Sequence, residues 1–130
     1  MTRIARPRYR LWATSVALAL ASTAPVLAHH GWSWTQNEFS EISGTITDIY
    51  VGNPHATVDV DVDGTIWRVE LAPPGRTMAA GFTEDAAAVG DEITAIGNRS
   101  QDPNEARMKA VRITIGEDTY DVYPDRAGDI

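Results

Sequence analysis

The chain has 130 residues, with 18 acidic against 11 basic side chains, a net charge of −7 and no cysteine. The missing thiols exclude disulfides, thiolate metal sites, a cysteine nucleophile and a lipoprotein anchor. The acidic balance disfavours nucleic-acid binding, because a negative surface repels phosphate backbones.

Residues 1–28 have the pattern of a secretory signal peptide. Four arginines precede the apolar stretch LWATSVALALASTAPVLA, and Val26-Leu27-Ala28 fits a cleavage site before His29. An uncleaved anchor is the alternative, but the apolar segment is barely long enough to span a membrane and contains Pro25. We therefore expect a periplasmic protein that is not membrane-spanning after cleavage. Its charge would be about −11, because the signal carries no acidic residue.

The first half of the mature chain is predicted to be an arm followed by three strands. Residues 29–40 have no clean period and are expected to form an N-terminal arm. Residues 41–53 are rich in β-branched side chains and predict a long strand, in which Gly44 marks a bend or bulge. Valine and aspartate then alternate within 55–63, as in a strand with one buried face, and a return strand is predicted over 65–71.

The second half is predicted to contain a short helical insert and three more strands. The insert covers 76–90, is rich in alanine and is split by Gly81. The remaining strands and a flexible tail are expected over 91–100, 106–115, 119–123 and 124–130.

The order of these elements predicts the fold class. Three meandering strands, a helix and a hairpin is the order of an OB-fold barrel. We therefore expect an all-β fold with a small α insert, an OB-like barrel of five to six antiparallel strands, within 41–123. A flat sheet with one helix is the alternative, but the glycine-bearing first strand favours a closed sheet.

The stretch DVDVDGTIWRVE, 59–70, matches the EF-hand calcium-loop pattern at every required position. A calcium loop needs a helix on each side, whereas a turn and β-branched residues precede this stretch and two prolines follow it. An aspartate at every second position also arises on a strand with one wet face. Asp63-Gly64 is a typical hairpin turn. We therefore predict a β-hairpin and no calcium site.

The histidines outside the signal are His29, His30 and His55. Cleavage before His29 would place a free α-amine beside its own imidazole, and amine and Nδ1 together chelate a metal. A third nitrogen, from His30 or His55, completes a T-shaped set that suits Cu(II). The alternative is a frayed polar terminus and one histidine in the Asn-Pro-His turn. Cleavage one or two residues away would abolish the chelate.

Three stretches carry a resemblance to a known family: AHHGW, SGTITDIYVGNPHATVDVDV and VGDEITAIGNRSQDPNEARMKAVRI. On these the chain resembles a family of small secreted bacterial proteins of unknown function, over nearly all of 28–115. Its most specific parts are His29-His30 and Asn53-Pro54-His55. The resemblance implies a periplasmic OB-type barrel and no activity, and it suggests that these histidines act together.

Two hypotheses for function follow. The first is a periplasmic protein that binds copper or another transition metal through His29, His30 and His55. The second is an accessory module without a metal, which binds a protein or small ligand through an exposed patch of tryptophans at 32, 34 and 67. A partner would then be a periplasmic or membrane-associated protein. No nucleophile elbow, zinc-protease motif or phosphate loop occurs, so we do not expect an enzyme.

Overall fold

The computed structural model describes residues 31–130. The predicted signal peptide 1–28 and the first two residues of the predicted arm, His29 and His30, lie outside the described residues. The elements run in chain order as β1 (Thr35–Tyr50), β2 (Thr57–Val62), β3 (Thr65–Glu70), α1 (Pro74–Ala79), β4 (Glu92–Ser100), β5 (Arg107–Ile115), β6 (Asp118–Asp121) and α2 (Pro124–Ala127).

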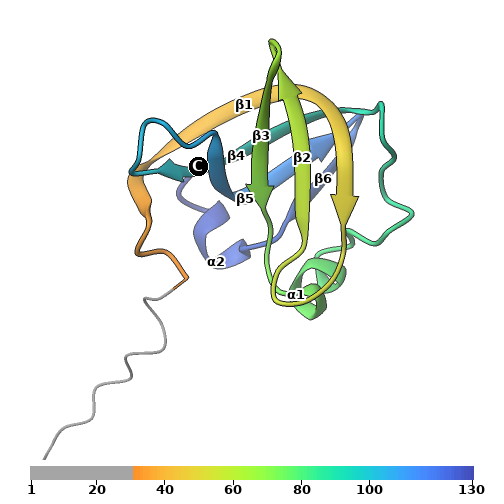
Figure 1. The fold of residues 1–130 in the computed structure, drawn as a ribbon. Helices are drawn as coiled ribbons and strands as arrows, with labels where there is room; N and C mark the ends of the chain where they lie inside the picture. Colours follow the sequence, from red (N-terminus) through yellow and green to blue (C-terminus); the bar gives the residue numbers. More distant parts are fainter. Residues whose placement is uncertain (1–30) are drawn as a thin grey trace, which may run out of the picture.

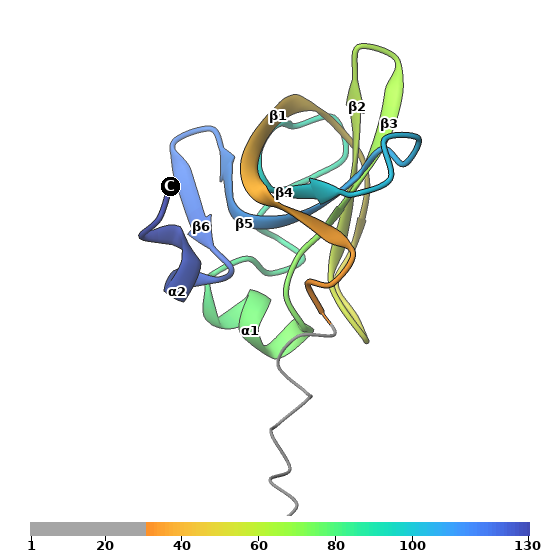
Figure 2. The same cartoon turned by 90° about the vertical axis from the view of Figure 1, so that its left-hand side faces the viewer.

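The strands form one six-stranded sheet that closes on itself. Its order is β3-β2-β1-β4-β5-β6, and all sequential neighbours pair antiparallel. The edge strand β3 also pairs with β5, in parallel, over Arg68–Glu70 and Arg107–Lys109. This pairing closes the ring of strands seen in Figure 2. The predicted all-β, OB-like barrel is therefore confirmed, and its closing pair is the one that is not antiparallel.

The long first strand curves across the barrel and pairs with two neighbours (Figure 1). Its pairing with β2 shifts register between Ile46 and Asp48, which is a bulge. A Cβ at Gly44 would collide with the backbone of Asp61, so only glycine permits this close approach. The predicted bend in the first strand is thus confirmed, because glycine and the bulge let one strand serve both halves of the barrel.

The calcium-like stretch is the β2–β3 hairpin. Asp63 and Gly64 have φ values of 51° and 88°, the left-handed pair of a tight hairpin turn. Val58 and Val60 are fully buried, while the alternating Asp59 and Asp61 face outward. The predicted hairpin is confirmed.

The barrel interior is the main core, and its side chains come from every strand from β1 to β5 and from the segment after α1. It comprises Ile42, Ile46, Ala56, Val58, Val60, Val69, Leu71, Phe82, Ile93, Ala95, Met108, Ala110 and Ile113. A β-bulge in the β4–β5 pairing explains why Ile113 is buried as well as Met108 and Ala110.

The helical insert is shorter than predicted. The sequence indicates helical character over 76–90, whereas α1 ends at Ala79. Gly81 has a φ of 96°, which terminates the helix, and Phe82 then enters the core. The helix begins at Pro74, where the missing N–H of proline costs nothing.

Both ends of the described chain are more ordered than the sequence indicates. The predicted arm, 29–40, already becomes strand β1 at Thr35, which pairs with Ser100. The tail, 124–130, was expected to be flexible, but α2 packs Ala127 against the outer face of β5. Both segments cover a second apolar cluster outside the barrel wall, and burying it offsets the entropy of ordering them. That cluster comprises Ala72, Val111, Val122, Tyr123 and Ala127, with Trp32, Phe39 and Ala80 packed on it.

Candidate functional site

His55 lies in the loop between β1 and β2, on the outer face of the barrel. Its side chain is half-buried and lines a shallow cleft of about 400 Å³. Asp48 and Tyr50 from β1 and Glu70 from β3 also line the cleft. The loop is tied down, because the Tyr50 hydroxyl donates a 2.9 Å hydrogen bond to the Asn53 carbonyl oxygen. His55 is thus held at one end of the barrel, at the surface.

The surroundings of His55 disfavour its protonated form. Burial lowers the pKa of His55 from its usual value, and the positive charge of Lys109 lowers it further, while Glu70 acts in the opposite direction. A neutral imidazole has one ring nitrogen with a lone pair, which is the form that ligates metals or accepts hydrogen bonds.

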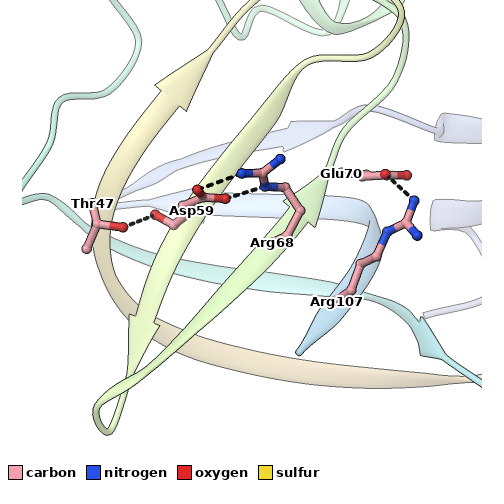
Figure 3. A network of polar contacts seen from close by, with 5 residues as sticks. All are labelled: Thr47, Asp59, Arg68, Glu70 and Arg107. Carbon is pink, nitrogen blue, oxygen red and sulfur yellow. Dashed lines mark hydrogen bonds and ion pairs between the residues drawn. The ribbon is translucent and has the colours of Figure 1, made fainter. Parts of the chain in front are cut away.

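Glu70, which lines the cleft, and Asp59 on β2 are each paired with an arginine (Figure 3). Asp59 accepts two hydrogen bonds from Arg68, at 2.5 and 2.9 Å, across the β2–β3 pair. Glu70 accepts a bond of 2.5 Å from Arg107 across the closing β3–β5 pair. The Asp59–Arg68 bonds raise the pKa of the Arg68 guanidinium. These carboxylates therefore hold strands together and have less capacity left for a cation.

Lys109 is the unexpected residue of this region. It is only 2% exposed, and its Nζ donates a 2.8 Å hydrogen bond to the carbonyl oxygen of Gly31. The ammonium also lies 4.8 Å from the centre of the Trp32 ring and 5.5 Å from that of Tyr123. Burial lowers the pKa of Lys109, the nearby Arg107 and Arg126 lower it too, and Glu70 opposes them.

The Lys109 contact and the His55 cleft belong to neighbouring strands. Lys109 stands beside Glu70 in the β3–β5 pairing, and Glu70 borders the His55 cleft. Both pictures place the first described residues at the same end of the barrel as the β1–β2 loop (Figures 1 and 2). The chain that directly follows His30 is therefore fixed near the end of the barrel that carries His55.

The predicted metal site is only partly covered by the described residues. His55 is placed as above, whereas His29 and His30 lie outside the part of the chain that the structure describes. Within 31–130, no group of three or more His, Cys, Asp or Glu side chains is arranged to hold a metal ion.

The sequence reading missed Lys109 and the cations that cover the aromatic rings. Arg107 lies 3.8 Å from the centre of the Trp34 ring, and Arg126 lies 3.8 Å from that of Trp32. The three tryptophans proposed as an exposed patch are each half-buried, with a cation over each ring. Val111 lies on the same outer face of β5 as Lys109. An apolar side chain at this position indicates in the sequence that another segment buries the outer face of β5.

Among the described residues, no helix is long and apolar enough to cross a membrane.

A search of curated proteins found no match. Among solved structures, the chain is similar to one in the crystal structure of the S. pombe Stn1-Ten1 complex, at 17% identity and a TM-score of 0.50. The match covers 62% of this chain and 59% of that chain, so it spans little more than half of the relative. This likeness concerns the fold alone. The model of a family of unknown function, DUF6152, matches residues 17–109, and the chain belongs to that family.

Proposed function

We propose that this chain is a periplasmic protein, secreted through a cleaved signal peptide, that binds copper or a similar transition metal through His29, His30 and His55. The role is binding and not catalysis. The α-amine and Nδ1 of His29 form the chelate, and a second histidine supplies the third nitrogen. Cu(II) favours such a tetragonal set of nitrogen ligands.

The observation that carries the proposal is the bond from Lys109 Nζ to the Gly31 carbonyl oxygen. Gly31 directly follows His30, and the bond anchors the chain at that point on strand β5. Strand β3, which contains Glu70, lies between β5 and the His55 loop. A ligand next to an anchored backbone position loses less conformational entropy on binding a metal than one at the end of a free segment, which favours affinity.

Titration of the mature protein with Cu(II), followed by electron paramagnetic resonance and calorimetry, tests the proposal. We expect one Cu(II) per chain with nitrogen hyperfine structure. A methionine added before His29 removes the amine chelate, and His55→Ala removes a candidate third ligand. Each change should weaken binding by more than about tenfold.

The matched control is Asp63→Asn, which changes a carboxylate on the hairpin turn but keeps a residue that tolerates a positive φ. This variant should bind Cu(II) like the wild type. Equal affinity of the methionine-extended and native proteins would refute the brace at His29. Unchanged binding by His55→Ala would remove His55 from the site and leave the two terminal histidines.

A second candidate function is a small-ligand-binding module without a metal. The observation that favours it is a cleft of about 410 Å³ at the opposite mouth of the barrel, bordered by Trp67 and Arg99. Mouths of β-barrels are common places for ligand sites. A protein that binds no Cu(II) in the titration above would point to this function.

A further inference from the structure

The cleft at the barrel mouth is lined by Gln36 at the start of β1, the first half of β3, the end of β4 and the loop that joins β4 to β5. It shares no lining residue with the cleft around His55. Thr65 and Trp67 form its β3 side, and the β3–β5 pairing begins only at Arg68. The barrel is therefore open at this point, and the cleft is the gap between β3 and the β4–β5 loop.

Arg99 gives this cleft a cation that protein groups do not neutralise. It stands opposite the buried Met108 in the β4–β5 pairing, so its side chain points toward the barrel interior at the mouth. Its guanidinium lies 4.8 Å from the centre of the Trp67 ring. Its Nε is buried and has no hydrogen-bond partner, and no carboxylate of residues 31–130 forms an ion pair with Arg99. A buried N–H without a partner is costly, so this position of the guanidinium is not explained by contacts within the protein.

Two carboxylates on the β4–β5 loop, which forms one wall of the cleft, decide what kind of ligand fits. Glu105 accepts a 2.7 Å hydrogen bond from the Ser100 hydroxyl, and Asp102 accepts one of 2.9 Å from the backbone N–H of Asn104. Each of these bonds uses one oxygen, so each carboxylate keeps a second oxygen for another donor. With one cation and two anions on its walls, the cleft disfavours a simple anion. A ligand with both charges satisfies both sides.

We propose that this cleft binds a small zwitterion of the amino-acid class. The ligand carboxylate pairs with the Arg99 guanidinium, whose planar fork suits bidentate contact with a carboxylate. The ligand ammonium faces Glu105 and Asp102, and an apolar side chain packs beside the Trp67 ring. The cleft volume of about 410 Å³ accommodates a ligand of this size. This inference rests on the second candidate function, whose ligand class it names, and does not depend on the proposed metal site.

Proton–nitrogen NMR of the metal-free protein tests the proposal through the indole N–H signal of Trp67. L-Leucine is added at millimolar concentrations, in parallel with isovalerate, which keeps only the carboxylate, and isoamylamine, which keeps only the ammonium. We expect saturable shifts of the Trp67 signal with leucine, and at least about tenfold weaker binding of each single-charge analogue. The absence of any shift with leucine would overturn the proposal, and so would an analogue that binds as tightly.

Arg99→Gln removes the cation and should abolish the leucine-induced shifts. The matched control is Arg112→Gln, because Arg112 is also a strand arginine but pairs with Asp121 in the β5–β6 hairpin. The control should respond to leucine like the wild type. Leucine binding that survives in a folded Arg99→Gln protein would overturn the proposal. Should that variant unfold, the comparison of leucine with its two analogues on the wild type decides.

Discussion

Lys109 and Gly31 are 78 residues apart in the sequence, yet the buried ammonium of the first donates a 2.8 Å hydrogen bond to the carbonyl oxygen of the second. The bond joins the start of the described chain to the outer face of β5. It lies under Trp32 and Tyr123, whose rings meet edge to face with centres 4.9 Å apart. The ammonium of Lys109 thus fixes the chain at Gly31, while Gln101 holds the carbonyl oxygens of Ser33 and Trp34.

Lys109→Met should loosen the chain at Gly31 and Trp32 while the barrel stays folded and the bonds from Gln101 to Ser33 and Trp34 remain. A hydrogen bond from a charged donor contributes about 1.5–3 kcal/mol, but the variant also removes the cost of burying the charge, so global stability should change little. In NMR spectra, the chemical shift of the Trp32 indole N–H should move toward the value of a solvent-exposed tryptophan, and this proton should exchange faster with water. Arg112→Met, another long cation lost from β5, is the control and should leave Trp32 unchanged. A Trp32 signal that does not move would contradict the anchoring role.

The Arg112–Asp121 pair predicts a small pH dependence of stability. The hydrogen bond from Arg112 lowers the pKa of Asp121 below its usual 3.8. Because the folded-state pKa is depressed, this stabilisation is present above pH 3.8 and is lost as the pH falls through the folded-state value. About a third of each side chain is exposed, so solvent screening limits the pair to about 1 kcal/mol or less.

Urea denaturation of the wild type and of Arg112→Gln, from neutral pH down to the acid limit of folding, measures this contribution. The difference in unfolding free energy should be largest near neutral pH and should vanish in acid. A difference that stays constant below pH 3.8 would show that the variant acts through packing and not through the ion pair.

Two glycines should respond in opposite directions to alanine. A Cβ at Gly97 would meet the backbone of Lys109 and Ala110 across the β4–β5 pair, so Gly97→Ala should destabilise the protein by about 1–3 kcal/mol. Gly75 lies in α1 with open space around it, and Gly75→Ala should stabilise by about 0.4–1 kcal/mol. Thermal and urea melts measure both. Equal effects of the two changes would contradict the close strand approach at Gly97.

Calcium at about millimolar concentration should leave the melting temperature unchanged, despite the EF-hand pattern at 59–70. Asp59 is paired with Arg68, and Asp61 Oδ1 accepts a 2.8 Å hydrogen bond from the Gly64 N–H. Calcium would have to replace both contacts. Differential scanning calorimetry with calcium, and with magnesium as the control ion, checks this. A rise of several degrees with calcium alone would restore a calcium site on the hairpin.

The sequence determined the elements whose signals are local. Alternation of Val58 and Val60 with aspartates reports which face of β2 is buried, because the pleat of a strand sets that period wherever the strand lies. Asp63-Gly64 encodes a turn, since only a left-handed backbone connects two strands so tightly. The order of three strands, one helix and a further hairpin along the chain then predicts an OB-like barrel, which the structure confirms.

Only the tertiary structure decided what covers the outside of the barrel and which charges are paired. Lys109 has the outward position of a solvated side chain, and its burial depends on Trp32 and α2, which come from opposite ends of the chain. Arg99 lines the open mouth between β3 and the β4–β5 loop and forms no ion pair with a carboxylate of residues 31–130. The sequence thus determined the strands and their inner faces through local periodicity. The anchored terminus and the open mouth arise from contacts between distant segments, which no local pattern encodes.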